Sequence, residues 1–290
     1  MLNHDGRRPR PSFRATLTSG TLAFALLTAG TASAVSASPD TAPSPEEIAG
    51  QAESSWPGLV TDVFDDRPMQ DGTGVITLEA PARATDPAIV PVKLTLDPAK
   101  NIRKVTLVID ENPSPVAATF TIGAKSGLTE LETRVRVNAY TDIHAVAEAA
   151  DGTLYMVKRF VKAAGGCAAP AAKDAVAAAK TIGQMRLKRF GAQEGSDGAR
   201  QVAQLMVRHP NNSGLQKDQV TLLYIPAHFI TDIRVESAGE EIFSMTGGIS
   251  ISEDPNFRFA YAGKGDEEFH AKATDTEGAV FEKEFAPGSS

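Results

Sequence analysis

The sequence predicts an all-β protein made of two β-sandwich domains, joined by a linker of small residues that carries the cysteine. Short runs of alternating apolar residues, such as Val105, Leu107 and Ile109, have the period of half-buried strands. Turn residues separate these runs, and no convincing long helix interrupts them. About seven short strands in roughly a hundred residues are typical of an immunoglobulin-like sandwich. The 290 residues of the chain suffice for two such domains.

The first sandwich is expected over residues 51–162, with a short helix within Glu46–Phe64 ahead of the sheet. Asp151-Gly152 separates the last two expected strands and is a strong hairpin signal. The expected strands are Val75–Ala80, Ile89–Leu96, Ile102–Asp110, Val116–Ile122, Leu128–Asn138, Thr141–Ala149 and Thr153–Val161.

The second sandwich is expected over residues 182–290, after a linker over residues 163–181. The linker consists almost entirely of small residues, and its segment Asp174–Lys180 predicts at most a brief alanine-rich helix. The expected strands of the second half are Met185–Phe190, Ala199–Arg208, Phe229–Ser237, Glu240–Met245, Asn256–Ala262, Glu267–Thr274 and Ala279–Phe285.

Residues 1–34 are expected to be a cleaved signal peptide. Basic residues precede the apolar run Leu17–Ala29, and this run ends in Ala32-Ser33-Ala34, which a signal peptidase accepts. The run is too short to be a stable membrane anchor. Arg7-Arg8 leaves export by the Sec or the Tat route undecided. Residues 35–50, rich in Ser, Ala and Pro, are a flexible tether. We therefore expect a periplasmic protein.

The net charge of the chain limits which classes of partner it can bind. Loss of residues 1–34 removes four arginines and one aspartate, which changes the net charge from −7 to −10. A body this acidic repels phosphate backbones and anionic lipids. We therefore expect neither nucleic acid nor membrane surfaces among its partners.

The chain contains one cysteine, Cys167, so it cannot form an internal disulfide. An unpaired thiol in an exported protein needs an explanation. Gly165 and Gly166 precede it, Pro170 follows, and no neighbour is large enough to fill a core. We interpret this segment as an exposed, flexible arm that presents the thiol to other proteins. A buried, inert cysteine is the alternative.

The same segment argues against catalysis, because a catalytic cysteine needs a fixed base beside it and no histidine is near. The histidines of the exported chain, His144, His209, His228 and His270, lack the spacing of metal ligands. We therefore expect neither an enzyme nor a metal or cofactor site.

Particular residues add a family resemblance. The first half resembles SoxY, the cysteine-bearing subunit of the sulfur-oxidation carrier complex, and the second half resembles SoxZ. The SoxY-like motifs are Trp56…Phe64, Asp71-Gly72, Val90-Pro91-Val92, Asp110-Glu111-Asn112-Pro113-Ser114-Pro115, Ala117-Ala118-Thr119-Phe120, Thr133-Arg134-Val135-Arg136, Ala145-Val146-Ala147-Glu148, Asp151-Gly152-Thr153-Leu154-Tyr155 and Gly165-Gly166-Cys167. The SoxZ-like motifs are Val207-Arg208-His209-Pro210, Gly239-Glu240-Glu241-Ile242-Phe243 and Ala273-Thr274-Asp275 with Glu277-Gly278.

The chain thus resembles a fused SoxYZ carrier of the type associated with quinoprotein (PQQ) dehydrogenases. The resemblance implies that Cys167 holds a thiosulfate-type intermediate covalently, with Gly165 and Gly166 as the flexible arm. It implies as partners periplasmic sulfur-oxidising enzymes and c-type cytochromes, or a quinoprotein dehydrogenase system. One departure is that Ala168-Ala169-Pro170 continues the chain where the family ends in Gly-Gly. The alternative function is therefore a non-covalent docking module for a quinoprotein dehydrogenase.

Overall fold

The computed structural model describes residues 54–170, 178–195 and 198–288. These residues all belong to one structural unit, Pro43–Ser290. The expected signal peptide, the tether, the start of the predicted helix at Glu46 and most of the alanine-rich segment Asp174–Lys180 lie outside the described residues.

One sheet has nine strands, and all of its neighbouring pairs are antiparallel except β1 with β8. From edge to edge its order is β1 (Met69–Asp71), β8 (Leu154–Val161), β7 (Thr141–Ala149), β4 (Ile102–Ile109), β5 (Val116–Ile122), β12 (Glu240–Gly247), β11 (Ile230–Ser237), β14 (Phe269–Asp275) and β15 (Val280–Phe285).

The second sheet has six strands, and all its pairs are antiparallel. Its order is β2 (Ile76–Glu79), β3 (Val90–Leu96), β6 (Glu130–Val135), β13 (Asn256–Tyr261), β10 (Gly198–Val207) and β9 (Met185–Gly195).

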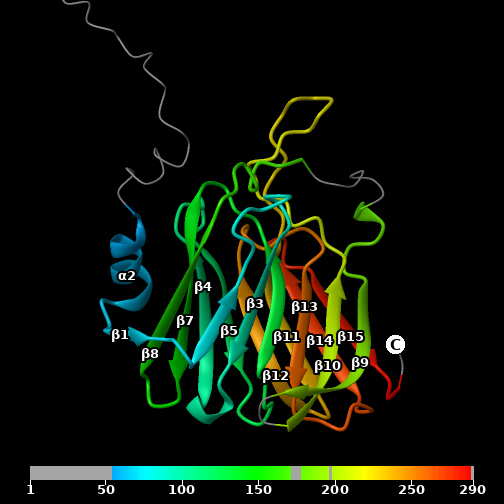
Figure 1. Cartoon of the computed structure of the whole chain (residues 1–290). Helices are drawn as coiled ribbons and strands as arrows, with labels where there is room; N and C mark the ends of the chain where they lie inside the picture. Colours follow the sequence, from blue (N-terminus) through cyan, green and yellow to red (C-terminus); the bar gives the residue numbers. More distant parts are fainter. Residues whose placement is uncertain (1–53, 171–177, 196–197, 289–290) are drawn as a thin grey trace, which may run out of the picture. The chain divides into compact units, whose positions relative to one another are not determined.

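Each sheet runs through both halves of the sequence (Figure 1). In the larger sheet β5 pairs with β12, and in the smaller one β6 pairs with β13. The cores merge at these pairings, where Phe120 of the first half contacts Phe243 and Phe257 of the second through aromatic rings about 6 Å apart. The prediction of an all-β protein is confirmed. The two sandwiches are joined by continuous sheets as well as by the linker.

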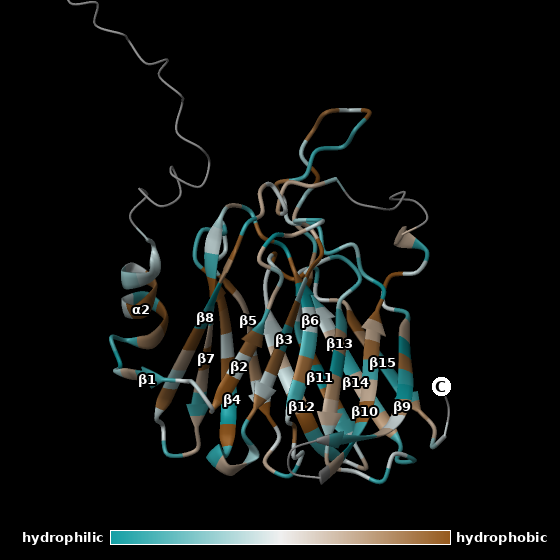
Figure 2. Ribbon diagram, viewed as in Figure 1, coloured by the Kyte–Doolittle hydropathy of each residue, from teal (hydrophilic) through white to brown (hydrophobic). Residues whose placement is uncertain are grey.

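Apolar residues recur along the strands of both halves (Figure 2). In β3 the side chains alternate between buried and more exposed positions, and Val90, Val92 and Leu94 are buried. Buried residues of both sheets and both halves form one continuous core cluster. The sequence alternation therefore reports correctly which face of such a strand meets the core.

Helix α2 (Trp56–Phe64) covers part of the outer face of the larger sheet (Figure 1). Pro57 supplies a favourable backbone angle at its first turn, and Asp65 ends it in a left-handed conformation (φ 54°). Its Phe64 packs on Val108 and on neighbouring strand residues. Within the described ranges, no helix has the length and hydropathy needed to cross a bilayer.

The expected strands are found with small shifts at their ends. Strands β5 and β7 have the predicted bounds, and β9 continues five residues beyond Phe190 to Gly195. Strand β1 was not predicted, because three residues that pair in parallel with β8 show no alternation of their own.

Candidate functional site

The cysteine lies in a short segment after β8, residues 163–170, which we call the arm. The arm is bound to the loop that follows β6. The backbone N–H of Gly165 donates to the carbonyl of Asn138 (2.8 Å), and that of Gly166 donates to the carbonyl of Val137 (3.1 Å). The arm then turns, since the N–H of Ala168 donates to the carbonyl of Gly165 (3.2 Å).

The backbone conformation and the close contacts of the docked arm require glycine at both positions, so the two glycines need not indicate mobility. Gly165 has φ +77°, which favours glycine. A Cβ on Gly166 would lie 2.0 Å from the carbonyl oxygen of Pro87 and 2.6 Å from that of Val137. The backbone of the arm therefore approaches the first half more closely than any side chain would permit.

The second half holds the other side of the arm. The hydroxyl of Ser213 donates to the carbonyl oxygen of Cys167. The amide of Gln216 donates to the carbonyl of Ala169 (3.0 Å), and its oxygen accepts from the N–H of Ser213 (3.0 Å). Because Ser213 and Gln216 are both buried, these bonds are shielded from water. Cys167 is thus held between the two halves.

The expectation that Cys167 is exposed on a flexible arm is wrong for this structure, in which the residue has 0% of its surface exposed. Gly165 and Gly166 take part in the docking of the arm instead of loosening it. Small residues are consistent with either behaviour, because they permit mobility and also permit close backbone contact. Burial raises the pKa of the Cys167 thiol to about 11, so the docked sulfur is protonated at neutral pH.

A buried cation accompanies the cysteine. Arg136 has 1% of its surface exposed, and its Nη1 donates to the carbonyl oxygens of Ile251 (2.6 Å) and Ile249 (3.3 Å). Among the described residues its Nε has no hydrogen-bond partner. Burial lowers the pKa of Arg136, while Cys167 and Glu253 act in the opposite direction. The guanidinium therefore lies within electrostatic reach of the thiol.

Asn112 fixes the chain around Arg136. Its Nδ2 donates to the carbonyl of Arg136 (2.7 Å) and to the hydroxyl of Ser250 (2.9 Å), and its Oδ1 accepts from the N–H of Asn138 (2.8 Å). Asn112 belongs to the first half and Ser250 to the second. One buried amide thus orders the loop whose carbonyls bind the arm and links that loop to the other half.

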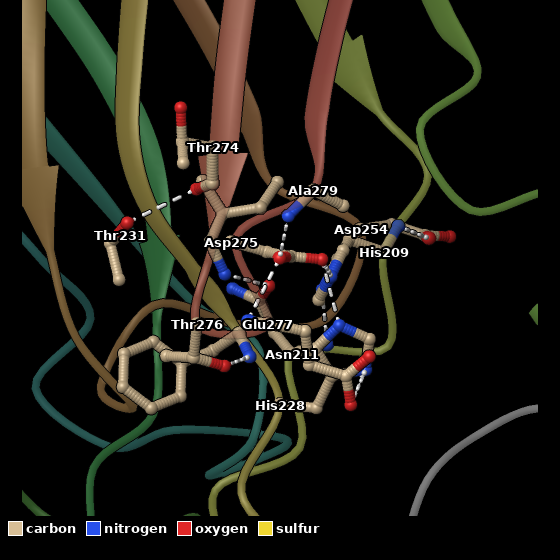
Figure 3. Close-up of polar contacts among 12 residues, drawn as sticks. His209, Asn211, His228, Thr231, Asp254, Thr274, Asp275, Thr276, Glu277 and Ala279 are labelled. Atoms are coloured by element: carbon tan, nitrogen blue, oxygen red, sulfur yellow. Dashed lines mark hydrogen bonds and ion pairs between the residues drawn. The ribbon is translucent and has the colours of Figure 1, made fainter.

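A second polar cluster anchors the segment that carries Ser213 (Figure 3). The Oδ2 of Asp275 lies 2.8 Å from Nε2 of His228 and 3.5 Å from Nε2 of His209. The N–H groups of Glu277 and Ala279 donate to the other oxygen of Asp275 (both 2.9 Å). This carboxylate therefore joins the two ends of the loop between His209 and His228.

One nitrogen or oxygen from each of His209, His228 and Asp275 lies within 4.8 Å of the others, which is compatible with a metal site. The hydrogen bonds argue otherwise. The N–H of Asn211 donates to Nδ1 of His209 (3.0 Å), so neutral His209 carries its proton on Nε2, the atom that faces Asp275. A metal needs that nitrogen deprotonated. The cluster is a clamp in which His228 and two backbone N–H groups hydrogen-bond to Asp275, while the buried Nε2 of His209 lies 3.5 Å from that carboxylate and has no hydrogen-bond partner among the described residues. Sequence spacing could not reveal it, because the three residues come from separate segments.

Asp110, Asp142 and His144 form another group of this kind. The Nδ1 of His144 lies 2.9 Å from Asp110, and its ring stacks on Trp56 with centroids 3.6 Å apart. Asp142 is paired with Lys158 (2.7 Å). His144 thus has a structural role, since it connects helix α2 to the sheet.

Sequence reasoning singled out Cys167 and the two glycines but missed the residues around them. Arg136 follows a buried valine in β6, and strict alternation would place it in solvent. Ser213 and Gln216 lie in a loop with no motif. Only long-range contacts bring these side chains to the arm.

Comparison with known proteins finds two family matches, one in each half of the chain. Residues 60–167 match the family described as sulfur oxidation protein SoxY, and residues 189–286 match sulphur oxidation protein SoxZ. Among solved structures, the sulfur carrier protein SoxY from Chlorobium limicola f thiosulfatophilum is similar, with 24% sequence identity and a TM-score of 0.32. That similarity covers 38% of this chain and 91% of the other. A comparison with curated proteins gives no match.

The SoxY match ends at Cys167, which is the residue that the two halves enclose. The SoxZ match contains Ser213 and Gln216, which hold the arm from the other side. The order of the two matches is the order of the two halves in the continuous sheets. The chain therefore belongs to the SoxY and SoxZ families of sulfur-oxidation carrier proteins, as a SoxYZ-like fusion in which both are joined in one polypeptide.

Proposed function

We propose that this chain is a periplasmic carrier that holds a small, thiosulfate-type sulfur intermediate covalently on Cys167 and presents it to partner enzymes. The observation that carries the proposal is the position of Cys167. The only cysteine of the chain lies at the end of the SoxY match, and Ser213 of the SoxZ half donates a hydrogen bond to its backbone carbonyl. A carrier rather than a catalyst is favoured, because the docked thiol has a raised pKa and is therefore a poor nucleophile.

Loading requires release of the arm, since reagents cannot reach a fully buried sulfur. Among the residues that the structure describes, few hydrogen bonds hold the arm: two backbone bonds to the loop after β6 and two side-chain bonds, from Ser213 and Gln216. Each such bond contributes roughly 1 kcal/mol net. Release of this short segment is therefore within reach of a docking partner, and the docked state protects the sulfur-bound group between loading and delivery.

The covalent step is an oxidation. Attachment of thiosulfate through its outer sulfur forms a Cys167–S–S–SO3⁻ group and releases the thiol proton and two electrons. We assign the electrons to a c-type cytochrome partner, and removal of the bound group to periplasmic sulfur-oxidising enzymes. Export through the signal peptide in residues 1–34, by the Sec or the Tat route, would bring the carrier to these partners.

Intact mass spectrometry of the protein purified from its native compartment tests this proposal. Cells supplied with thiosulfate should yield protein with a sulfur or thiosulfonate mass increment. The increment should disappear on reduction and be absent from Cys167→Ser protein. A thiol that stays unmodified under these conditions would disprove covalent carriage.

The buried thiol and the continuing chain also favour a second function, a non-covalent docking module for a quinoprotein (PQQ) dehydrogenase system. Ala168, Ala169 and Pro170 follow the cysteine, so the arm is attached at both ends. Replacement of Cys167 by Ala in the producing organism separates the two functions. Loss of thiosulfate oxidation supports the carrier, whereas unchanged growth and unchanged sulfur metabolism support the docking module, which does not need the thiol.

A further inference from the structure

Arg136 is a buried charge with no ion-pair partner among the described residues, and Glu253 acts on it only at longer range. Both hydrogen bonds of its Nη1 go to neutral carbonyl groups, those of Ile249 and Ile251. No described carboxylate lies within the 4.0 Å of an ion pair with Arg136, and its Nε donates to none of the described residues. A buried cation in such surroundings is costly, because two hydrogen bonds to neutral carbonyl groups replace only part of its lost hydration.

The chain places this cation beside the docked cysteine. Arg136 immediately precedes Val137, whose carbonyl accepts the N–H of Gly166, the residue before Cys167. The guanidinium is close enough to Cys167 to lower the pKa of its thiol, against the larger effect of burial. Asn112 and Ser250 fix the backbone of Arg136 from both halves, so it is held where the arm docks.

We infer that Arg136 is the anion-binding group of the carrier: when the arm docks with an anionic, sulfonate-type group on Cys167, the guanidinium Nε donates to an oxygen of that group. The inference rests on the proposed function and adds to it the chemical class of cargo that the docked state retains. An anion on the sulfur offsets the charge of Arg136, and a neutral group of similar size leaves it uncompensated.

Two reagents give protein loaded with an anionic or a neutral group. Tetrathionate exchanges with the Cys167 thiolate, whose sulfur displaces thiosulfate and forms Cys167–S–S–SO3⁻. Methyl methanethiosulfonate gives the neutral Cys167–S–S–CH3 and releases methanesulfinate. Loss of each group to dithiothreitol is then followed by intact mass, and the two rate constants are expressed as a ratio, anionic over neutral. This ratio cancels differences between variants that change arm opening equally for both groups, and it keeps the difference that depends on the charge of the group.

Arg136→Gln should raise the ratio by roughly ten- to a hundredfold, the effect of one charge-assisted hydrogen bond. Arg136→Lys should recover part of the retention, because the charge is kept. Arg134→Gln is the matched control: Arg134 lies two residues earlier, and its Nε also has no hydrogen-bond partner among the described residues, but it is less buried and its Nη2 donates to the backbone carbonyl of Asp254. Its ratio should equal that of the wild type.

A ratio that is the same in the wild type and Arg136→Gln would overturn the inference. If Arg136→Gln fails to fold, thermal unfolding of the two loaded wild-type proteins decides. The thiosulfonate form should melt at a higher temperature than the methyl disulfide form, and the reverse order would refute anion binding. Either negative result leaves covalent carriage standing, because that function is tested separately by the adduct on the native protein.

Discussion

The hydroxyl of Ser213 donates a hydrogen bond to the carbonyl oxygen of Cys167, and this bond crosses from the SoxZ half to the end of the SoxY half. The side chain of Ser213 therefore binds the backbone of the cysteine and leaves the sulfur free of direct hydrogen bonding to it. This hydrogen bond therefore does not itself depend on which group the sulfur carries. It also makes the SoxZ half part of the cysteine site.

Ser213→Ala should increase the accessibility of the thiol. Removal of the hydroxyl leaves the buried carbonyl of Cys167 without that donor, which costs roughly 1–3 kcal/mol in the docked state. Because the open state does not incur this cost, alkylation of Cys167 by iodoacetamide at neutral pH should accelerate by roughly five- to a hundredfold. The measurement is the rate of alkylation followed by intact mass.

Ser244→Ala is the control for this experiment. Ser244 is half-buried where Ser213 is buried, and its hydroxyl donates to Glu241 (3.1 Å), within β12 and away from the arm. Its removal should leave the alkylation rate unchanged. Equal rates for wild type and Ser213→Ala would show that the hydroxyl does not hold the arm.

Gly166→Ala should prevent docking, because the added Cβ would lie 2.0 Å from the backbone oxygen of Pro87. A backbone atom cannot move aside as a flexible side chain can. We expect Cys167 to react with thiol reagents at the rate of an unfolded peptide while the β-sheet circular dichroism stays native. Gly58→Ala is the control, since a Cβ there meets nothing within 4 Å and Gly58 lies in helix α2. It should leave thiol reactivity unchanged.

The strands could be predicted from sequence because burial in a half-covered sheet imposes alternation. Strands β5 and β7 were placed to the residue. In β4, Leu107 and Ile109 face the core between the sheets, while Val108 is buried beneath α2 by Phe64. An apolar residue on the outer face of a strand thus indicates, in the local sequence, that a helix covers that face. The pairings of β5 with β12 and of β6 with β13 join distant segments, and no local pattern encodes them.

The state of the arm could not be predicted for a related reason. Gly165, Gly166 and Cys167 have no bulk of their own, so their burial depends on what surrounds them. The surroundings are supplied by Pro87 and Val137 in one half and Ser213 in the other. The small residues alone therefore predicted a mobile arm, whereas the fold packs the arm closely between the two halves.

Stability should fall above pH 9 because of Cys167. Burial raises the pKa of its thiol from 9.0 to about 11. Between these values the unfolded chain loses the thiol proton and the docked chain keeps it. The stabilising contribution is thus present below pH 9 and is lost as pH rises through the folded pKa. Urea unfolding from pH 8 to 11 should show a steeper decline for wild type than for Cys167→Ala. Parallel curves would contradict burial of the thiol.

The clamp around Asp275 should make the fold sensitive to acid. Burial and the nearby His228 lower the pKa of His209 from 6.5, so the unfolded chain takes up this proton before the folded chain does. The contribution of His209 is present above pH 6.5 and is lost as pH falls towards the folded pKa. Urea unfolding between pH 7.5 and 5 should show this decline, and His209→Gln, less stable at neutral pH, should flatten it. An unchanged slope would contradict the assignment.

The halves should stay together when the linker is cut. A protease site inserted between Pro170 and Ala178 allows cleavage without any change to the described strands. Pairing of β5 with β12 and of β6 with β13, together with the shared aromatic cluster of Phe120, Phe243 and Phe257, should hold the fragments as one particle.

Size-exclusion chromatography after cleavage should therefore show one peak with the elution volume of the intact chain, and thermal unfolding should remain a single transition. The melting temperature of the cut protein should rise with concentration, because unfolding now separates two chains. Fragments that elute separately at micromolar concentration would show that the linker, rather than the continuous sheets, joins the halves. In that case the hydrogen bond from Ser213 to Cys167 would also depend on the linker. The two halves could then not form the cysteine site as separate chains.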